Sequence, residues 1–251
     1  MKMKVFIIQA RKTIYGLMPA QDFGFTLIQA IDWWEWYYGC EKYNFILSET
    51  VPNKLEGYMP NQVVPVGSVE FVHAFIDKYR DVGCKKPLNI PKELMRPEYL
   101  KRKVWVGNIS ENNTNKRLFV KDNTKVKGFT DILAPGDTCP LSEYLISEVI
   151  PIHSEWRCFV YNGMLLDIKN YQGDFARLPS IPVINKMIRD FSRVGAYTLD
   201  VGVNEEGTFI IEAHPFYSCG LYGFEDYQKL PLMLISGWNQ IVGSRNNIQK
   251  K

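Results

Sequence analysis

Several short motifs that mark well-known enzyme classes are absent from this sequence. It contains no GxxxxGKS/T phosphate loop, no GxSxG or HExxH motif and no set of protein-kinase signatures. These absences exclude a phosphate cradle of the GxxxxGKS/T kind and argue against serine hydrolases, zinc proteases and ordinary kinases. None of the 5 cysteines lies in a CxxC or CxxH pair. We therefore expect free thiols, with no zinc site and no redox-active pair built from such motifs.

A strong charge of one sign and long apolar runs are missing as well. The net charge is only +3, from 30 basic and 27 acidic residues, and the lysines and arginines are dispersed along the chain. We therefore expect no nucleic-acid partner and no membrane partner. The first apolar run, in MKMKVFIIQARK, holds only about five residues, which is too short for a signal segment or a membrane span. The expected location is the cytoplasm.

The sequence does contain a succession of short strand and helix patterns near its beginning. Strands are predicted at 4–9, 44–48 and 62–66, and helices at 25–39 and 69–83. Ser68 is a suitable N-cap for the second helix, and Gly83 is a suitable residue to end it. This order of elements predicts a small α/β domain over residues 1–86.

The rest of the chain is richer in strands. A connection marked by prolines leads to predicted strands at 103–107, 117–121 and 142–150, a hairpin at 156–171, a helix at 181–195, a second hairpin at 197–213, a helix at 227–243 and a solvated tail at 245–251. The sequence has no internal repeats. We expect an α/β (α+β) protein in which residues 87–145 and 146–251 form two further lobes.

The second hairpin, in YTLDVGVNEEGTFIIEAHPFYSCG, has polar residues where apolar ones are expected. Its strands flank the turn 204–207. Alternation along a strand places Glu212 and His214 on one face, and Asp200 is in a position to lie opposite them. Two carboxylates and an imidazole would then converge, and the acids would repel each other unless a cation or a proton joined them. The alternative is an edge hairpin whose acids face water.

Charged residues interrupt the other apolar strands in the same manner. The basic ones are Lys121, Arg157 and Lys169, and the acidic ones are Glu148, Glu155, Asp200 and Glu212. A site for a nucleoside triphosphate with magnesium needs both kinds, because phosphates require lysine or arginine and the metal requires carboxylate oxygens.

These residues resemble the motifs of the ATP-grasp superfamily over roughly residues 100–220. The closing motif of that family is an acid in a strand, a glycine turn, and a strand ending in Glu-x-Asn-Pro with a glycine shortly after. Here Asp200, Gly207, Glu212-Ala213-His214-Pro215 and Gly220 match it, with His214 in place of asparagine. Glu148 and Glu155, seven residues apart, match the hinge acids, and Lys121 matches the strand lysine. The chain looks most like the short R2K-type ATP-grasp proteins of phage and bacterial genomes.

The resemblance implies a role for each matching residue. It implies an ATP-grasp fold, in which 1–86 is a pre-ATP-grasp domain and two lobes, 87–145 and 146–251, clasp ATP. The implied nucleotide-binding residues are Lys103, Lys121, Lys127, Glu148, Val149, Ile150, Glu155 and Lys169. The implied catalytic residues are Arg157 and Lys169, and the implied ligands of Mg²⁺, or of Mn²⁺, are Asp200, Glu212 and His214. Arg102 is an alternative to Lys103 as the first phosphate contact.

The implied activity is ATP-dependent ligation of a carboxylate to an amine or a thiol through an acylphosphate. The substrates would be small molecules, or peptide or protein carboxylates and amines. An alternative from another class is a nucleotide-binding module without turnover that acts as a regulatory or scaffold partner. The loop 123–128 is expected to cover the phosphates and to become ordered when nucleotide binds.

Overall fold

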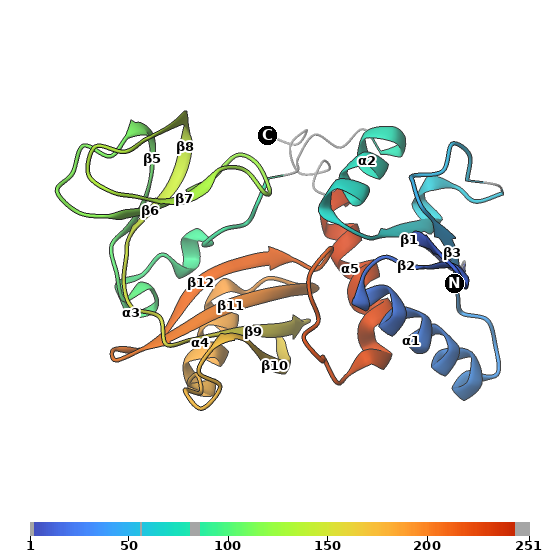
Figure 1. Ribbon diagram of the computed structural model, residues 1–251. Helices are drawn as coiled ribbons and strands as arrows, with labels where there is room; N and C mark the ends of the chain where they lie inside the picture. Colours follow the sequence, from blue (N-terminus) through green and yellow to red (C-terminus); the bar gives the residue numbers. More distant parts are fainter. Residues whose placement is uncertain (1–2, 56, 81–85, 244–251) are drawn as a thin grey trace, which may run out of the picture. The chain divides into compact units, whose positions relative to one another are not determined.

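The computed structural model describes residues 3–55, 57–80 and 86–243. The chain divides into two compact units, one comprising Met1–Cys84 with Pro215–Lys251 and the other comprising Lys85–His214. Each unit combines β-strands with α-helices (Figure 1), which confirms the expected mixed α/β class. The division into three parts at residues 86 and 145 stays a prediction.

A mostly parallel sheet forms the centre of the first unit. Its strands are β1 (Lys4–Thr13), β2 (Gly16–Pro19), β3 (Tyr43–Ser48) and β4 (Val63–Val66). β3 and β4 pair with β1 in parallel, while β2 pairs antiparallel with the last four residues of β1. Val5–Ile8 are all buried, as is typical of a parallel strand covered on both faces.

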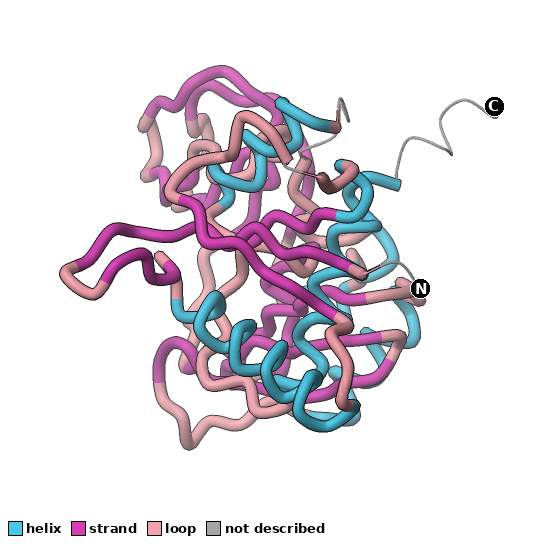
Figure 2. The backbone as a smooth tube through the Cα atoms, turned by 90° about the vertical axis from the view of Figure 1, so that its right-hand side faces the viewer, coloured by secondary structure: helices cyan, strands magenta, loops and turns pink. Residues whose placement is uncertain are grey.

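Helices pack beside this sheet (Figures 1 and 2). They are α1 (Asp22–Tyr38), α2 (Val69–Tyr79) and α5 (Leu230–Gly243), with the short turns η1 (Pro60–Gln62) and η3 (Tyr227–Lys229). Gly39 ends α1 in the left-handed conformation, at φ 64°. The Ser68 side chain accepts a hydrogen bond from the Phe71 amide at 3.3 Å, which confirms the predicted N-cap of α2. The predicted helix end at Gly83 and the tail 245–251 lie outside the described residues.

Two four-stranded sheets form most of the second unit. One has the order β5-β8-β6-β7 and the other has the order β10-β9-β11-β12. The strands are β5 (Val104–Glu111), β6 (Leu118–Asp122), β7 (Thr130–Leu133), β8 (Thr138–Glu148), β9 (Ser154–Tyr161), β10 (Met164–Gly173), β11 (Ala196–Asn204) and β12 (Gly207–Pro215). The helical segments are η2 (Lys92–Leu94), α3 (Pro97–Leu100) and α4 (Ile181–Phe191).

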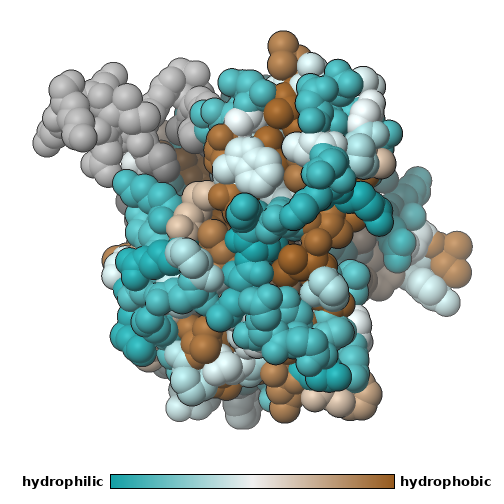
Figure 3. Space-filling model, turned by 90° about the vertical axis from the view of Figure 1, so that its left-hand side faces the viewer, coloured by the Kyte–Doolittle hydropathy of each residue, from teal (hydrophilic) through white to brown (hydrophobic). Residues whose placement is uncertain are grey.

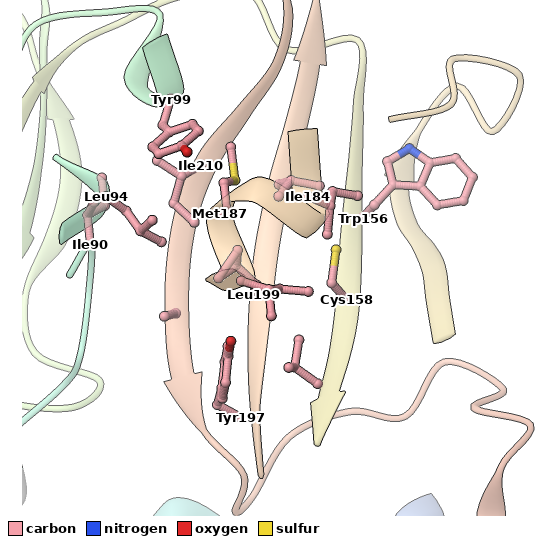
Figure 4. Close-up of a cluster of buried hydrophobic side chains, with 14 of the residues drawn as sticks. Ile90, Leu94, Tyr99, Trp156, Cys158, Ile184, Met187, Tyr197, Leu199 and Ile210 are labelled. Atoms are coloured by element: carbon pink, nitrogen blue, oxygen red, sulfur yellow. The ribbon is translucent and has the colours of Figure 1, made fainter. Parts of the chain in front are cut away.

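The larger core of the second unit lies on one face of the sheet that contains β9 and β11 (Figure 4). Cys158 and Leu199 from the strands meet Ile184 and Met187 of α4 there, and residues of the segment before β5 complete the cluster. Because side chains alternate along a strand, Arg157 and Asp200 lie on the opposite face. The core thus fixes which residues the sheet presents for function.

Several predicted elements differ in the structure. The strand predicted at 142–150 extends from Thr138 to Glu148, and the helix predicted at 227–243 begins as the turn η3 before α5. The helix predicted at 181–195 ends at Phe191, because Ser192 adopts the left-handed conformation at φ 48°. The strand β2 was not predicted, since its four residues pair only with an extension of β1 beyond the predicted residues 4–9. The described cysteines, Cys40, Cys139, Cys158 and Cys219, are free. Within the described ranges, no helix is long and apolar enough to span a membrane.

Candidate functional site

A row of charged residues crosses the sheet β10-β9-β11-β12 of the second unit. Arg157 on β9 pairs with Lys169 on β10 and with Asp200 on β11. Residues directly opposite each other on antiparallel strands project to the same face, so the three side chains are neighbours. The register of β10 shifts by one residue between Leu165 and Asp167. Without this bulge Lys169 would pair with Trp156 and face the core, so the bulge re-aims Lys169 toward Arg157.

Asp200 and Arg157 form a buried, bidentate ion pair. The Arg157 Nε and Nη2 atoms donate to the two carboxylate oxygens of Asp200 at 2.9 and 2.7 Å. The Asp200 side chain is only 3% exposed and that of Arg157 is 13% exposed. Burial raises the pKa of Asp200, while the hydrogen bonds and charge of Arg157 act in the opposite direction. The two-point geometry is that of a carboxylate with a guanidinium, so Arg157 fixes the orientation of Asp200.

Glu212 has a cation partner of its own. Lys121, on β6 of the other sheet of this unit, forms an ion pair with the Glu212 carboxylate on β12. Lys121 and Glu212 are 26% and 25% exposed. Asp200 and Glu212 are close enough for the charge of Glu212 to raise the pKa of Asp200. The sequence predicted repulsion between these two acids, and in the structure Arg157 and Lys121 offset it.

Further polar contacts surround the row. The Tyr171 hydroxyl donates to Glu155 Oε2 at 2.7 Å, and the Arg157 guanidinium lies 5.7 Å from the Tyr171 ring centroid. Lys169 Nζ lies 3.3 Å from a carboxylate oxygen of Asp167. Sequence reasoning did not identify Tyr171 or Asp167. Both lie two residues from Lys169 in the sequence. That spacing identifies neither of them unless the register of β10 is known.

Glu148, the first of the two predicted hinge acids, lies at a separate place in the same unit, whereas the second, Glu155, contacts Tyr171 beside the row. Glu148 Oε2 accepts from the Lys103 amide at 3.1 Å, and the Glu148 amide donates to the Lys103 carbonyl at 3.1 Å. The hydrogen bond from Lys103 is the main reason why the pKa of Glu148 is lowered. Val149 and Ile150 follow at the end of β8, exposed and half-buried respectively.

A cleft of about 780 Å³ opens at this hinge. Lys103 and Glu148 line it together with Leu100, Arg102 and Trp105. Figure 3 looks onto this side of the second unit, where hydrophobic side chains lie among hydrophilic ones. The Arg102 guanidinium donates to the carbonyls of Leu100 and Ile210 at 3.0 and 3.1 Å, and burial lowers its pKa to about 10. The guanidinium of Arg102 is thus held by main-chain carbonyls, whereas Lys103 is exposed.

The loop between β6 and β7 is closed by Asp122. Its Oδ1 accepts hydrogen bonds from the amides of Thr124 and Lys125 at 2.7 and 3.0 Å. Burial opposes ionisation of Asp122, yet these bonds and the Thr124 hydroxyl lower its pKa. A Cβ at Gly128 would lie 2.5 Å from the Cβ of Asp122, so this turn requires glycine. Lys127 sits in the loop with φ 55°.

The donor set near Asp200 and Glu212 is compatible with magnesium. Among the described residues, no three histidine, cysteine, aspartate or glutamate side chains gather as a group that could hold a metal ion. Magnesium does not need such a group, because it is usually bound by one or two carboxylates together with substrate phosphates and water. Two neighbouring carboxylates fit that pattern, and the assignment of His214 as a ligand stays a prediction.

The family of the chain follows from its sequence. A family model described as ATP-grasp domain, R2K clade family 2, matches residues 99–230, which is more than half of the chain. The chain belongs to this family. The match includes Lys103, Lys121, Arg157, Asp200 and Glu212, and it confirms the resemblance on which the sequence-based roles rest. No curated protein matches the sequence.

Solved structures agree with the family. D-alanine–D-alanine ligase from Bacillus anthracis has a TM-score of 0.54 at 14% identity, with 97% of this chain and 99% of the ligase covered. Its complex with ATP has a TM-score of 0.51 over the same shares of the two chains, again at 14% identity. N5-carboxyaminoimidazole synthetase from Staphylococcus aureus, complexed with ADP, has a TM-score of 0.56 at 10% identity, with 94% and 78% covered. The ATP-grasp protein thus has the fold predicted from its sequence.

Proposed function

We propose that this ATP-grasp protein is an ATP-dependent ligase that joins a carboxylate to an amine or a thiol. The observation that carries the proposal is the row of Lys169, Arg157 and Asp200, with the Glu212–Lys121 pair beside it. Phosphates need the cations of this row, and a divalent metal needs its carboxylates. Two of the structurally similar proteins, D-alanine–D-alanine ligase and N5-carboxyaminoimidazole synthetase, support the same reaction class.

The nucleotide would lie between the hinge and the charged row. Glu148, Val149 and Ile150 would contact the adenine, and Glu155 would bind the ribose hydroxyls. The triphosphate would be held by Lys103, Lys121, Lys127 and Lys169. The cleft at Lys103 and Glu148 supports this placement, since base recognition needs a partly apolar recess.

The reaction would take place in two steps. In the first, a substrate carboxylate oxygen attacks the γ-phosphorus of ATP, the bond from that phosphorus to the bridging oxygen breaks, and ADP leaves. In the second, an amine or thiol attacks the acyl carbon of the acylphosphate, the carbon–oxygen bond breaks, inorganic phosphate leaves, and the nucleophile loses a proton. Lys121 and Lys169 offset phosphate charge, and Arg157, oriented by Asp200, stabilises the acylphosphate.

Asp200 and Glu212 would hold Mg²⁺, with His214 as a proposed further ligand and Mn²⁺ as a second possible ion. When bound, the ion neutralises charge on the phosphates. Lys121 contacts the Oε2 atom of Glu212, and the arriving triphosphate would give Lys121 a second anionic partner.

Mg-ATP is expected to stabilise the protein. Ligand present at about one hundred times its Kd raises the free energy of unfolding by about 2.7 kcal/mol, because it binds only the folded state. Thermal melts with ATP and Mg²⁺ together, and with each alone, measure this effect. Release of ADP across a set of carboxylates and amines then separates a ligase from a silent regulatory module. No thermal shift at millimolar Mg-ATP would contradict both functions.

His214→Asn tests the residue that departs from the family motif. Asparagine offers the amide oxygen that magnesium prefers, whereas imidazole suits softer ions. The ratio of ADP release with Mn²⁺ to that with Mg²⁺ should therefore fall in the variant. An unchanged ratio would remove His214 from the proposed set of ligands.

A further inference from the structure

Asn89 lies in the segment before β5, outside every motif described above, and it contacts both sheets of the second unit. Its carbonyl accepts from the Ala213 amide at 2.7 Å, so it pairs with the residue that follows Glu212. Its side-chain amide donates to Asn123 Oδ1 at 2.9 Å, at the start of the loop that follows Lys121. Asn89 is only 2% exposed.

The contacts of Asn89 continue into the sheet β5-β8-β6-β7 of the same unit. The Asn123 side chain donates in turn to Glu143 Oε1 at 2.7 Å, and the Asn123 amide donates to the Glu143 carbonyl at 2.9 Å. A chain of hydrogen bonds therefore runs from β12 through Asn89 and Asn123 to β8. It joins the strand that carries Glu212 to the loop that follows Lys121.

Two features of Asn89 lower the stability of the fold and are not explained by packing alone. Its φ of 47° lies in the left-handed region, which asparagine tolerates better than most residues. Its buried Oδ1 atom has no hydrogen-bond partner among the residues that the structure describes. The amide cannot be reversed to satisfy that oxygen, because the nitrogen faces two acceptors, Asn123 Oδ1 and the Asp122 carbonyl at 3.4 Å. Unsatisfied buried groups are rare and call for an explanation.

We propose that Asn89 is a positioning residue that holds the loop 123–128 in place over the bound triphosphate. The inference rests on the proposed function, because it assigns the loop to the phosphates. Asn89 touches no reacting atom in this scheme. By anchoring the loop to β12, it sets the distance between the loop lysines and the carboxylate Glu212, so that phosphate and metal contacts form together.

Asn89→Gly tests the proposal. Glycine accepts the positive φ, so the backbone is retained while the bond to Asn123 is lost. One such bond contributes on the order of 1 kcal/mol, so the Kd for Mg-ATP should rise roughly five- to tenfold. Amide hydrogen exchange at residues 123–128 should accelerate by a similar factor in the absence of nucleotide. Asn123→Ala removes the same bond from the other side, together with the side-chain bond to Glu143, and the effect of the double substitution on Kd should be smaller than the sum of the two single effects.

Asn112→Ala is the matched control. Asn112 is 1% exposed and donates to the carbonyls of Lys116 and Leu133 at 2.8 and 3.0 Å, at the other end of β6. It should lower the free energy of unfolding without changing the Kd for Mg-ATP. Equal effects of the Asn89 and Asn112 variants on Kd, or additive effects of Asn89→Gly and Asn123→Ala, would overturn the proposal. Unchanged exchange in the loop of both Asn89→Gly and Asn123→Ala would also overturn it, and this readout needs no nucleotide. Absence of Mg-ATP binding to the parent protein would instead count against the proposed function.

Discussion

Glu212→Gln is expected to lower turnover of Mg-ATP by about two to three orders of magnitude in a protein that remains folded. The amide supplies one neutral oxygen where the ion needs an anionic one, and it removes the carboxylate that pairs with Lys121. Loss of transition-state stabilisation of about 3–4 kcal/mol would lower the rate by two to three orders of magnitude. ADP release in the presence of substrate carboxylates measures it.

The stability of the Glu212→Gln variant follows from the ion pair. If Glu212 only repelled Asp200, its neutralisation would stabilise the metal-free fold. Because Lys121 already offsets that repulsion and both side chains are about a quarter exposed, the free energy of unfolding should change by less than about 1 kcal/mol. Glu205→Gln, in the turn of the same hairpin, is the control, since the Glu205 side chain is 77% exposed and belongs to no proposed site. Turnover of Glu212→Gln at the rate of this control would remove Glu212 from the metal site.

Much of the fold could be predicted because local patterns and tertiary packing agree. Asn162 and Gly163, at φ 49° and 76°, form the expected hairpin turn between β9 and β10. Ser68 and Gly39 mark helix ends that the structure retains. At such positions the backbone conformation depends on one or two residues, so the sequence is sufficient to identify it.

The charged row was predicted as a set of residues but not as an arrangement. Lys121 and Glu212 lie 91 residues apart and meet only because two sheets are brought together. The position of Lys169 depends on a bulge in β10 that has no clear signature in the residues 164–169. Asn89 gave no signal at all, since an asparagine between prolines is typical of an ordinary connection. Contacts of this kind depend on register and long-range packing, which local patterns do not encode.

The buried Arg157–Asp200 pair gives the largest expected effect on stability. Asp200→Asn keeps the shape of the side chain but removes the negative charge from the bidentate pair with Arg157, in a largely buried position. Removing one charge of a buried ion pair costs about 3–5 kcal/mol, because the remaining charge loses the carboxylate that compensated its burial. Chemical denaturation should therefore show a loss of about 3 kcal/mol in the free energy of unfolding.

Two comparisons separate this effect from a general loss of packing. Glu98→Gln removes the charge of an acid whose partner Lys186 is 50% exposed, and it should cost less than about 1 kcal/mol. Arg157→Met combined with Asp200→Asn removes both charges, so its cost should be clearly smaller than the sum of the two single substitutions. Strict additivity would mean that the two side chains are not coupled. In that case neither side chain would orient the other, and the proposed orientation of Arg157 by Asp200 for binding the acylphosphate would fail.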